Sequence, residues 1–164
     1  MGKPNPVADR PPPPQGPLAR AAFLVGGAGL LIATLIDSLA VLGRHTGFAF
    51  LGSIEIVQSA VVLAASGAII VATLARSHAA VHILTDRLSP AAAGRLAHIA
   101  AALAAIVFLC MAIGSGWLMV EGWGGHERTE LLHIPFRWLR LIWTLAAALV
   151  AVLFLIQPWR RRGA

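Results

Sequence analysis

The segment LAHIAAALAAIVFLCMAIGSGWLMV, residues 96–120, decides the fold of this chain, and it contains no Asp, Glu, Lys or Arg. A helix needs about 20 predominantly apolar residues to cross a hydrocarbon core of about 30 Å. Because no water reaches the backbone amides there, such a segment is stable only with its hydrogen bonds satisfied internally, as in a helix. The segment therefore predicts a membrane-spanning helix.

Apolar runs of similar length lie on both sides of this segment in a chain that is 58% hydrophobic and 12% charged. Soluble proteins carry roughly twice that charged fraction, about 25%. The four predicted spans are about 21–42, 56–75, 96–120 and 138–157. The expected fold class is an all-α membrane protein with four transmembrane helices, which form a membrane domain over residues 20–158.

The net charge of +6 is distributed unevenly over the predicted connections. Nine Lys and Arg residues fall on one side of a four-span arrangement and four on the other. The first set is Lys3, Arg10, Arg20, Arg76, Arg87, Arg95 and Arg160 to Arg162, and the second is Arg44, Arg128, Arg137 and Arg140. The positive-inside rule then places both termini in the cytoplasm. The basic character follows from topology, and no nucleic-acid partner is expected.

The two ends of the chain differ from the membrane domain in composition. Seven of the first seventeen residues are prolines, which favour extended conformations and bury little surface. We expect residues 1–19 to form a disordered cytoplasmic tail and residues 159–164 to form a short basic one.

The segment at residues 77–88 is too short to span a membrane, yet it has helical periodicity. In a helix, Val81, Leu84 and Leu88 would form one stripe. A second stripe would contain His78, His82 and Asp86. We expect an amphipathic arm that lies in the cytoplasmic interface of the bilayer. Ser89 and Pro90, which favour a helix start, then predict where the third span begins.

Ionisable residues within spans are functional candidates, since an unpaired charge in hydrocarbon is costly. Asp37 and Arg44 belong to the end of the first span, and Glu55 to the start of the second, so the three predict a cluster near the outer surface of the membrane. A structural ion pair, a substrate or ion site, and a Glu55 that complements a helix N-terminus all remain open.

The second span carries small side chains at four-residue spacing, which form a smooth ridge on one face of a helix. These residues are Ala60, Ala64, Ala68 and Ala72. We expect the ridge to be a packing face.

The sequence shows no nucleophile paired with a base and no phosphate-binding loop, so no enzyme activity, catalytic residue or cofactor is expected. Two alternatives stay open. The six histidines allow a membrane cytochrome-like haem protein, although none lies centrally in a span, and Asp37 or Glu55 allows a small proton-coupled exporter.

Three stretches resemble one known family: Glu55 at the head of the second span, RSHAAVHILTDRL at residues 76–88, and ERTELLHIPFRW at residues 127–138. They are similar to the small integral membrane subunit of tripartite ATP-independent periplasmic (TRAP) transporters, over residues 20–157. The family's Leu-x-Ile-Pro appears as residues 132–135, ending at Pro135, with Thr129 at the usual hydroxyl position. His82 stands where the family's arm carries an acid.

The resemblance implies a non-catalytic small permease subunit, multi-pass in a bacterial inner membrane. It would scaffold a larger elevator-type membrane subunit that carries organic acids with sodium, while a periplasmic solute-binding protein delivers the solute. The loop at residues 121–137 is the expected contact with that periplasmic partner. The resemblance does not name the solute.

Overall fold

The structure is a computed structural model that describes residues 16–75, 89–125 and 127–160. These residues contain four helices: α1 (Pro17–Thr46), α2 (Ser53–Leu74), α4 (Pro90–Glu121) and α5 (Phe136–Arg160). All four are long and apolar enough to cross a membrane, and no strand occurs among the described residues, so the predicted all-α class with four spans is confirmed. The predicted arm and most of the proline-rich tail lie outside the described residues.

Local sequence explains where the helices begin and end. Pro17 opens α1, and Gly47 ends it with a left-handed φ of 81°. As predicted, Ser89 caps α4: its hydroxyl oxygen accepts a hydrogen bond from the backbone N–H of Ala92 at 3.4 Å, and Pro90 follows in the first turn. The last turn of α1 contains Arg44, so the helix continues beyond the apolar run into a charged segment that favours a helix C-terminus.

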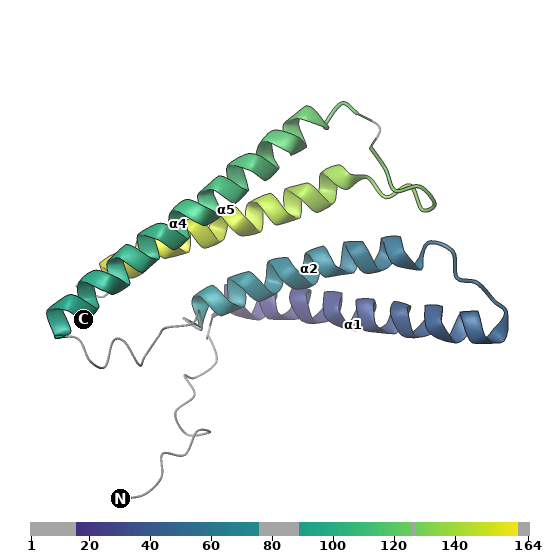
Figure 1. The fold of residues 1–164 in the computed structure, drawn as a ribbon, viewed down its shortest axis with the longest axis horizontal. Coiled ribbons are helices and arrows are strands. Elements are labelled where there is room, and N and C mark those ends of the chain that lie inside the picture. The colour runs from purple at the N-terminus through teal and green to yellow at the C-terminus, as the bar shows by residue number, and fades with distance from the viewer. Residues whose placement is uncertain (1–15, 76–88, 126, 161–164) are drawn as a thin grey trace, which may run out of the picture.

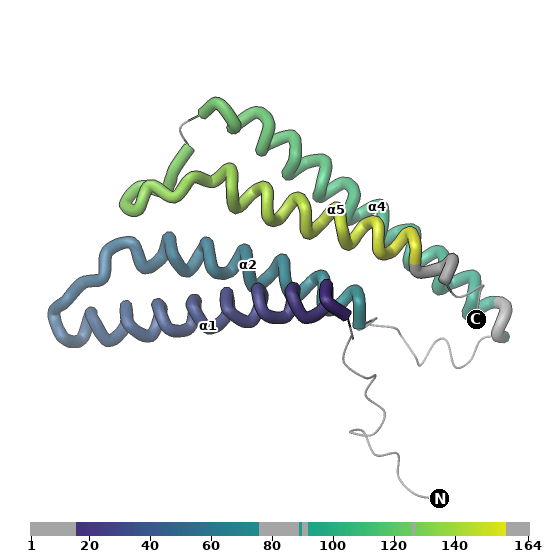
Figure 2. Tube along the Cα trace, turned by 180° about the vertical axis from the view of Figure 1, so that it is seen from behind, coloured from purple at the N-terminus to yellow at the C-terminus, as the bar shows by residue number. Residues whose placement is uncertain are grey.

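The helices pack in the order α1, α2, α5, α4, so that they form an open layer (Figures 1 and 2). Within the described residues, α1 has no extensive contact with α4 or α5, and the four helices do not close into a ring. Burial follows this order. In the most apolar stretch of each helix, 11% of residues are buried in α1 and α4, the edge helices, against 22% in α2 and 28% in α5.

Both short connections, residues 47–52 and 122–135, lie at the same end of the layer (Figure 1). We call this end the loop end. The start of α1 and the end of α5 lie at the opposite end.

Backbone contact between α1 and α2 is unusually close because glycines face alanines. A Cβ added at Gly29 would lie 2.7 Å from the carbonyl oxygen of Ala60 and from the amide nitrogen of Ala64. Gly26 faces Gly67 in the same way, with the added Cβ 3.2 Å from the Gly67 Cα. The alanine ridge therefore packs against α1 within the chain at Ala60 and Ala64.

The second interface joins α2 to the α4–α5 hairpin. Its core is formed by Ala105, Val150 and Phe154, with Ile69 and Ile70 of α2 packed against them. The rings of Phe108 and Phe154 stack with centroids 6.0 Å apart. Nearer the loop end, the Thr144 hydroxyl donates to the Ser115 hydroxyl at 2.8 Å, which links α5 to α4.

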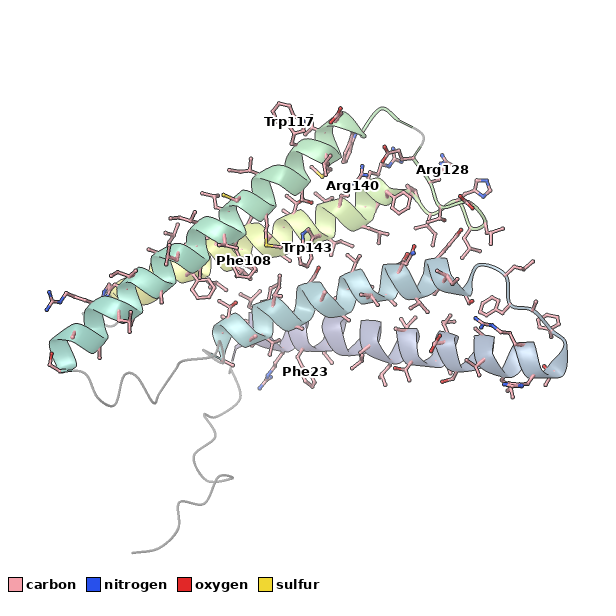
Figure 3. All side chains as sticks on the ribbon, in the orientation of Figure 1. Phe23, Phe108, Trp117, Arg128, Arg140 and Trp143 are labelled. Atoms are coloured by element: carbon pink, nitrogen blue, oxygen red, sulfur yellow. The ribbon has the colours of Figure 1, made fainter. Side chains whose placement is uncertain are left out.

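The outward faces of the layer are apolar. Phe23 and Leu31 on α1 and Trp117 on α4 are 67%, 73% and 72% exposed. Figure 3 shows Phe23 and Trp117 pointing away from the other helices. Large exposed apolar side chains on this scale are costly in water, so these faces are suited to lipid or to a membrane partner.

Candidate functional site

The carboxylate of Glu55 joins the two hairpins at the loop end. Its Oε1 accepts a hydrogen bond from the backbone N–H of Leu131, and its Oε2 accepts one from Leu132, both at 2.8 Å. Glu55 lies in the first turn of α2, where a carboxylate also complements the partial positive charge of the helix end. The residue is only 9% exposed, and it holds a loop that lies more than seventy positions further along the chain.

The loop that Glu55 holds is itself ordered by a short antiparallel pairing. Thr129 N–H donates to the carbonyl oxygen of Ile134 at 3.1 Å, and the Thr129 hydroxyl accepts from Ile134 N–H at 2.9 Å. Arg128 pairs with Pro135 in an isolated bridge. The Thr129 side chain also lies beside the Glu55 carboxylate, and both residues line the same cavity. The buried Thr129 therefore connects the loop's own pairing to α2.

We name this network of Glu55, Thr129, Leu131 and Leu132 the Glu55 clasp. Packing reinforces it, since a Cβ added at Gly52 would lie 3.1 Å from Cγ of Leu132. Gly52 also has a left-handed φ of 88°, which glycine adopts without strain. The turn that starts α2 and the loop that precedes α5 therefore fit against one another.

A cavity of about 640 Å³ lies beside the clasp, between the 47–52 connection and the 128–136 segment. Arg44 and Arg128 line it together with Glu55 and Gln58, and most of its wall is apolar. The structure thus brings Arg44 and Glu55 to one cavity, as the sequence suggested. Asp37 does not line it. In the described part of the chain neither Asp37 nor Arg44 forms a salt bridge with Glu55.

A second group of polar contacts fixes the start of α5 against the end of α4. Arg140 Nη1 lies 2.7 Å from Glu127 Oε2 in a salt bridge and donates to the carbonyl oxygen of Leu118 at 3.3 Å. This carbonyl belongs to the last turn of α4, where a cation is favourable. Figure 3 shows Arg140 at this end of the hairpin. The sequence analysis did not predict this salt bridge. A Glu and an Arg thirteen positions apart, on the two sides of a loop turn, have no spacing that indicates contact.

Arg137 lies against two indole rings. Its guanidinium carbon is 5.6 Å from the ring centroid of Trp138 and 6.0 Å from that of Trp123, and the two rings meet edge to face. Such contacts attract a cation and restrict its orientation. The sequence analysis did not foresee this contact between Arg137 and the two tryptophans.

Several predicted residues are not placed with the clasp. His78, Val81, Leu84 and Leu88 of the arm lie outside the described residues. Ala68 and Ala72 belong to the half of α2 away from the loop end, and Ala68 is exposed. Among the described residues no group of three or more His, Cys, Asp or Glu side chains is arranged to hold a metal ion.

The residues of the clasp lie within a region that matches a known family. The family model described as "Tripartite ATP-independent periplasmic transporters, DctQ component" matches residues 32–163, which includes Glu55 and the whole loop. Neither the curated proteins nor the solved structures give a match. The matched region is most of the chain and contains three of the four spans in full. The chain therefore belongs to the DctQ component family of the TRAP transporters, as the small permease component of such a system.

Proposed function

We propose that this chain is a passive scaffold that widens the stationary part of a TRAP transporter. The carrying observation is the open layer of helices. Within the described residues the four helices enclose no common centre, so the chain offers a broad apolar surface and no closed ring through which a solute would pass. A transport pathway must then be supplied by another chain.

Family membership indicates what that chain is. The DctQ component works with a larger membrane component, DctM, and with a periplasmic binding protein. We propose that the corresponding large subunit docks against this layer and moves organic acids with sodium by an elevator movement. The edge helices α1 and α4 are the least buried, so they have the most exposed apolar surface for that contact.

The same proposal assigns the cellular membrane and the side of it on which each end of the layer lies. The chain lies in a bacterial inner membrane with both termini in the cytoplasm, so the loop end faces the periplasm. There the clasp holds the 127–135 loop in position to contact the solute-binding protein. The arm at residues 77–88 would then lie on the cytoplasmic surface and resist tilting of the layer.

Reconstitution tests the scaffold role. The purified chain in proteoliposomes should move no organic acid, and addition of the large subunit with the binding protein should give sodium-dependent uptake. The decisive arm omits this chain from the otherwise complete system. Undiminished uptake without it, or solute movement by the chain alone, would contradict the proposal.

Cysteine accessibility tests the sides. Single cysteines are placed at Thr46 and at Ala164 in a Cys110→Ala background and labelled from outside intact cells with a membrane-impermeant maleimide. Thr46 at the loop end should label, and Ala164 should label only after permeabilisation. The reverse pattern would invert the assigned topology.

A further inference from the structure

The end of the α4–α5 hairpin contains a small polar cavity that the scaffold role does not use. Its volume is about 120 Å³, and Arg128 and Arg137 line it together with Glu127 and Trp123. Small-molecule pockets are usually about 300 Å³ or larger, so this cavity has room for a group the size of a phosphate and little more.

Two unpaired cations make the cavity electropositive. Glu127 is already paired with Arg140, so its charge is offset. Within the described residues Arg137 has no hydrogen-bond acceptor, and its Nε is buried without a partner. Arg128 likewise forms no salt bridge there. The next nearest acidic residues in the sequence, Glu130 and Glu121, are both exposed, and neither lines the cavity.

Of the two arginines that line the cavity, Arg137 is held in place by aromatic rings. The indoles of Trp123 and Trp138 restrict the Arg137 guanidinium, which leaves its planar donor fork pre-organised for a phosphate. Tryptophans of this kind settle at the headgroup level of a bilayer. Trp123 and Trp138 are 45% and 50% exposed, as such a position requires.

A separate apolar groove lies on α4 close to the cavity in the sequence. Its lining includes Ile113, Trp117 and Val120 and ends at Glu121, and the lining of the polar cavity begins at the next residue, Gly122. The groove has a volume of about 490 Å³. A polar recess with room for a phosphate, together with an apolar groove that begins at the neighbouring residue of α4, matches a phospholipid better than a free anion.

We infer that the α4–α5 hairpin binds one phospholipid, with Arg128 and Arg137 donating hydrogen bonds to its phosphate oxygens and an acyl chain lying in the groove beside Trp117. The site is independent of the scaffold role, since it requires only that this hairpin end lies at a membrane surface.

Lipid titration of the purified full-length chain tests the site. Phosphatidylglycerol in detergent should raise Tm and remain bound in native mass spectrometry, because a ligand that binds only the folded state stabilises it. Arg128→Gln removes one exposed cation and should weaken binding by about tenfold, as expected for loss of one charge-assisted hydrogen bond. Arg137→Gln should act in the same direction. Arg44→Gln, an exposed arginine at the same end on the other hairpin, is the matched control and should bind as the parent chain does.

Two further arms identify the ligand, and a third measures binding to the solute-binding protein. Diacylglycerol, which has the chains without the phosphate, should give no comparable shift, and inorganic phosphate should not compete at millimolar concentration. Equal stabilisation by diacylglycerol, full competition by inorganic phosphate, or unchanged lipid binding in both Arg128→Gln and Arg137→Gln would overturn the site. Loss of binding to the solute-binding protein in these variants, with no lipid effect, would instead make the cavity a protein contact and would also overturn it.

Discussion

The carboxylate of Glu55 and the backbone N–H of Leu131 are 2.8 Å apart although 76 positions separate them in the chain. With the matching bond to Leu132, this contact is the polar link between the start of α2 and the loop that leads into α5. A carboxylate that accepts two amide hydrogen bonds at a helix N-terminus serves the helix and the loop at once. One side chain therefore fixes how the two hairpins meet at the loop end.

Replacing Glu55 should loosen the loop end. Glu55→Ala leaves two backbone amides without an acceptor, and Glu55→Gln keeps one acceptor oxygen while losing the charge. We expect Tm to fall by several degrees in the alanine variant and by less in the glutamine variant. Differential scanning fluorimetry in detergent measures this. Glu130→Gln, an exposed acid in the same loop, should leave Tm within error, and an equal fall there would remove the special role of Glu55.

The sequence was sufficient to predict the four spans. A hydrocarbon core requires a certain length and an apolar composition, and each segment shows both by itself. It was also sufficient for the start of α4, because Ser89 and Pro90 act locally. The helices extend beyond the predicted spans at several ends, as where α1 reaches Thr46 and α4 starts at Pro90. Polar residues continue a helix outside the membrane without contributing to hydropathy.

The partners of Glu55 were not predictable in the same way. The sequence placed the acid at a helix start and near Arg44, which left open an ion pair, a substrate or ion site, and a carboxylate that complements the helix N-terminus. The structure instead directs its carboxylate to amides of a distant loop, and backbone amides have no sequence signature. The resemblance had already singled out Glu55, Thr129 and the residues 132–135 separately. The structure shows the physical reason that they occur together, since all belong to the clasp or its loop.

The close approach of α1 and α2 gives a matched pair of variants. Gly29→Ala places a methyl group 2.7 Å from backbone atoms of Ala60 and Ala64, whereas Gly27→Ala meets nothing within 4 Å. Both changes gain the same helix propensity, so their difference isolates packing. Overpacking of this kind costs about 1–3 kcal/mol.

Gly29→Ala should therefore unfold at lower denaturant or temperature than Gly27→Ala. Equilibrium unfolding of the two variants under identical detergent conditions provides the comparison. Equal stability would mean that α1 and α2 are further apart than in this structure.

The alanine ridge divides into two parts that should behave differently. Ala64 faces the Gly29 backbone of α1, whereas Ala68 is exposed in the isolated chain. Ala64→Leu should lower Tm of the purified chain. Ala68→Leu should leave that Tm nearly unchanged and should reduce co-purification with the large subunit if this part of α2 contacts it. Unchanged co-purification with Ala68→Leu would show that the exposed part of the ridge faces lipid.

The hydroxyl pair of Thr144 and Ser115 tests how much a single polar contact contributes between α4 and α5. The donor and acceptor oxygens are 2.8 Å apart and partly buried, and both belong to membrane-spanning segments. Interhelical hydrogen bonds in membrane proteins average about 0.6 kcal/mol in double-mutant cycles, because the separated helices also find partners. A cycle of Thr144→Val, Ser115→Ala and the double variant should give a coupling of about that size. Ser38→Ala is the control, since its hydroxyl donates only to the Thr34 carbonyl of its own helix. A coupling near zero, with losses in each single variant no larger than in Ser38→Ala, would show that apolar packing around Phe108 and Phe154 holds this hairpin without help from the hydroxyl pair.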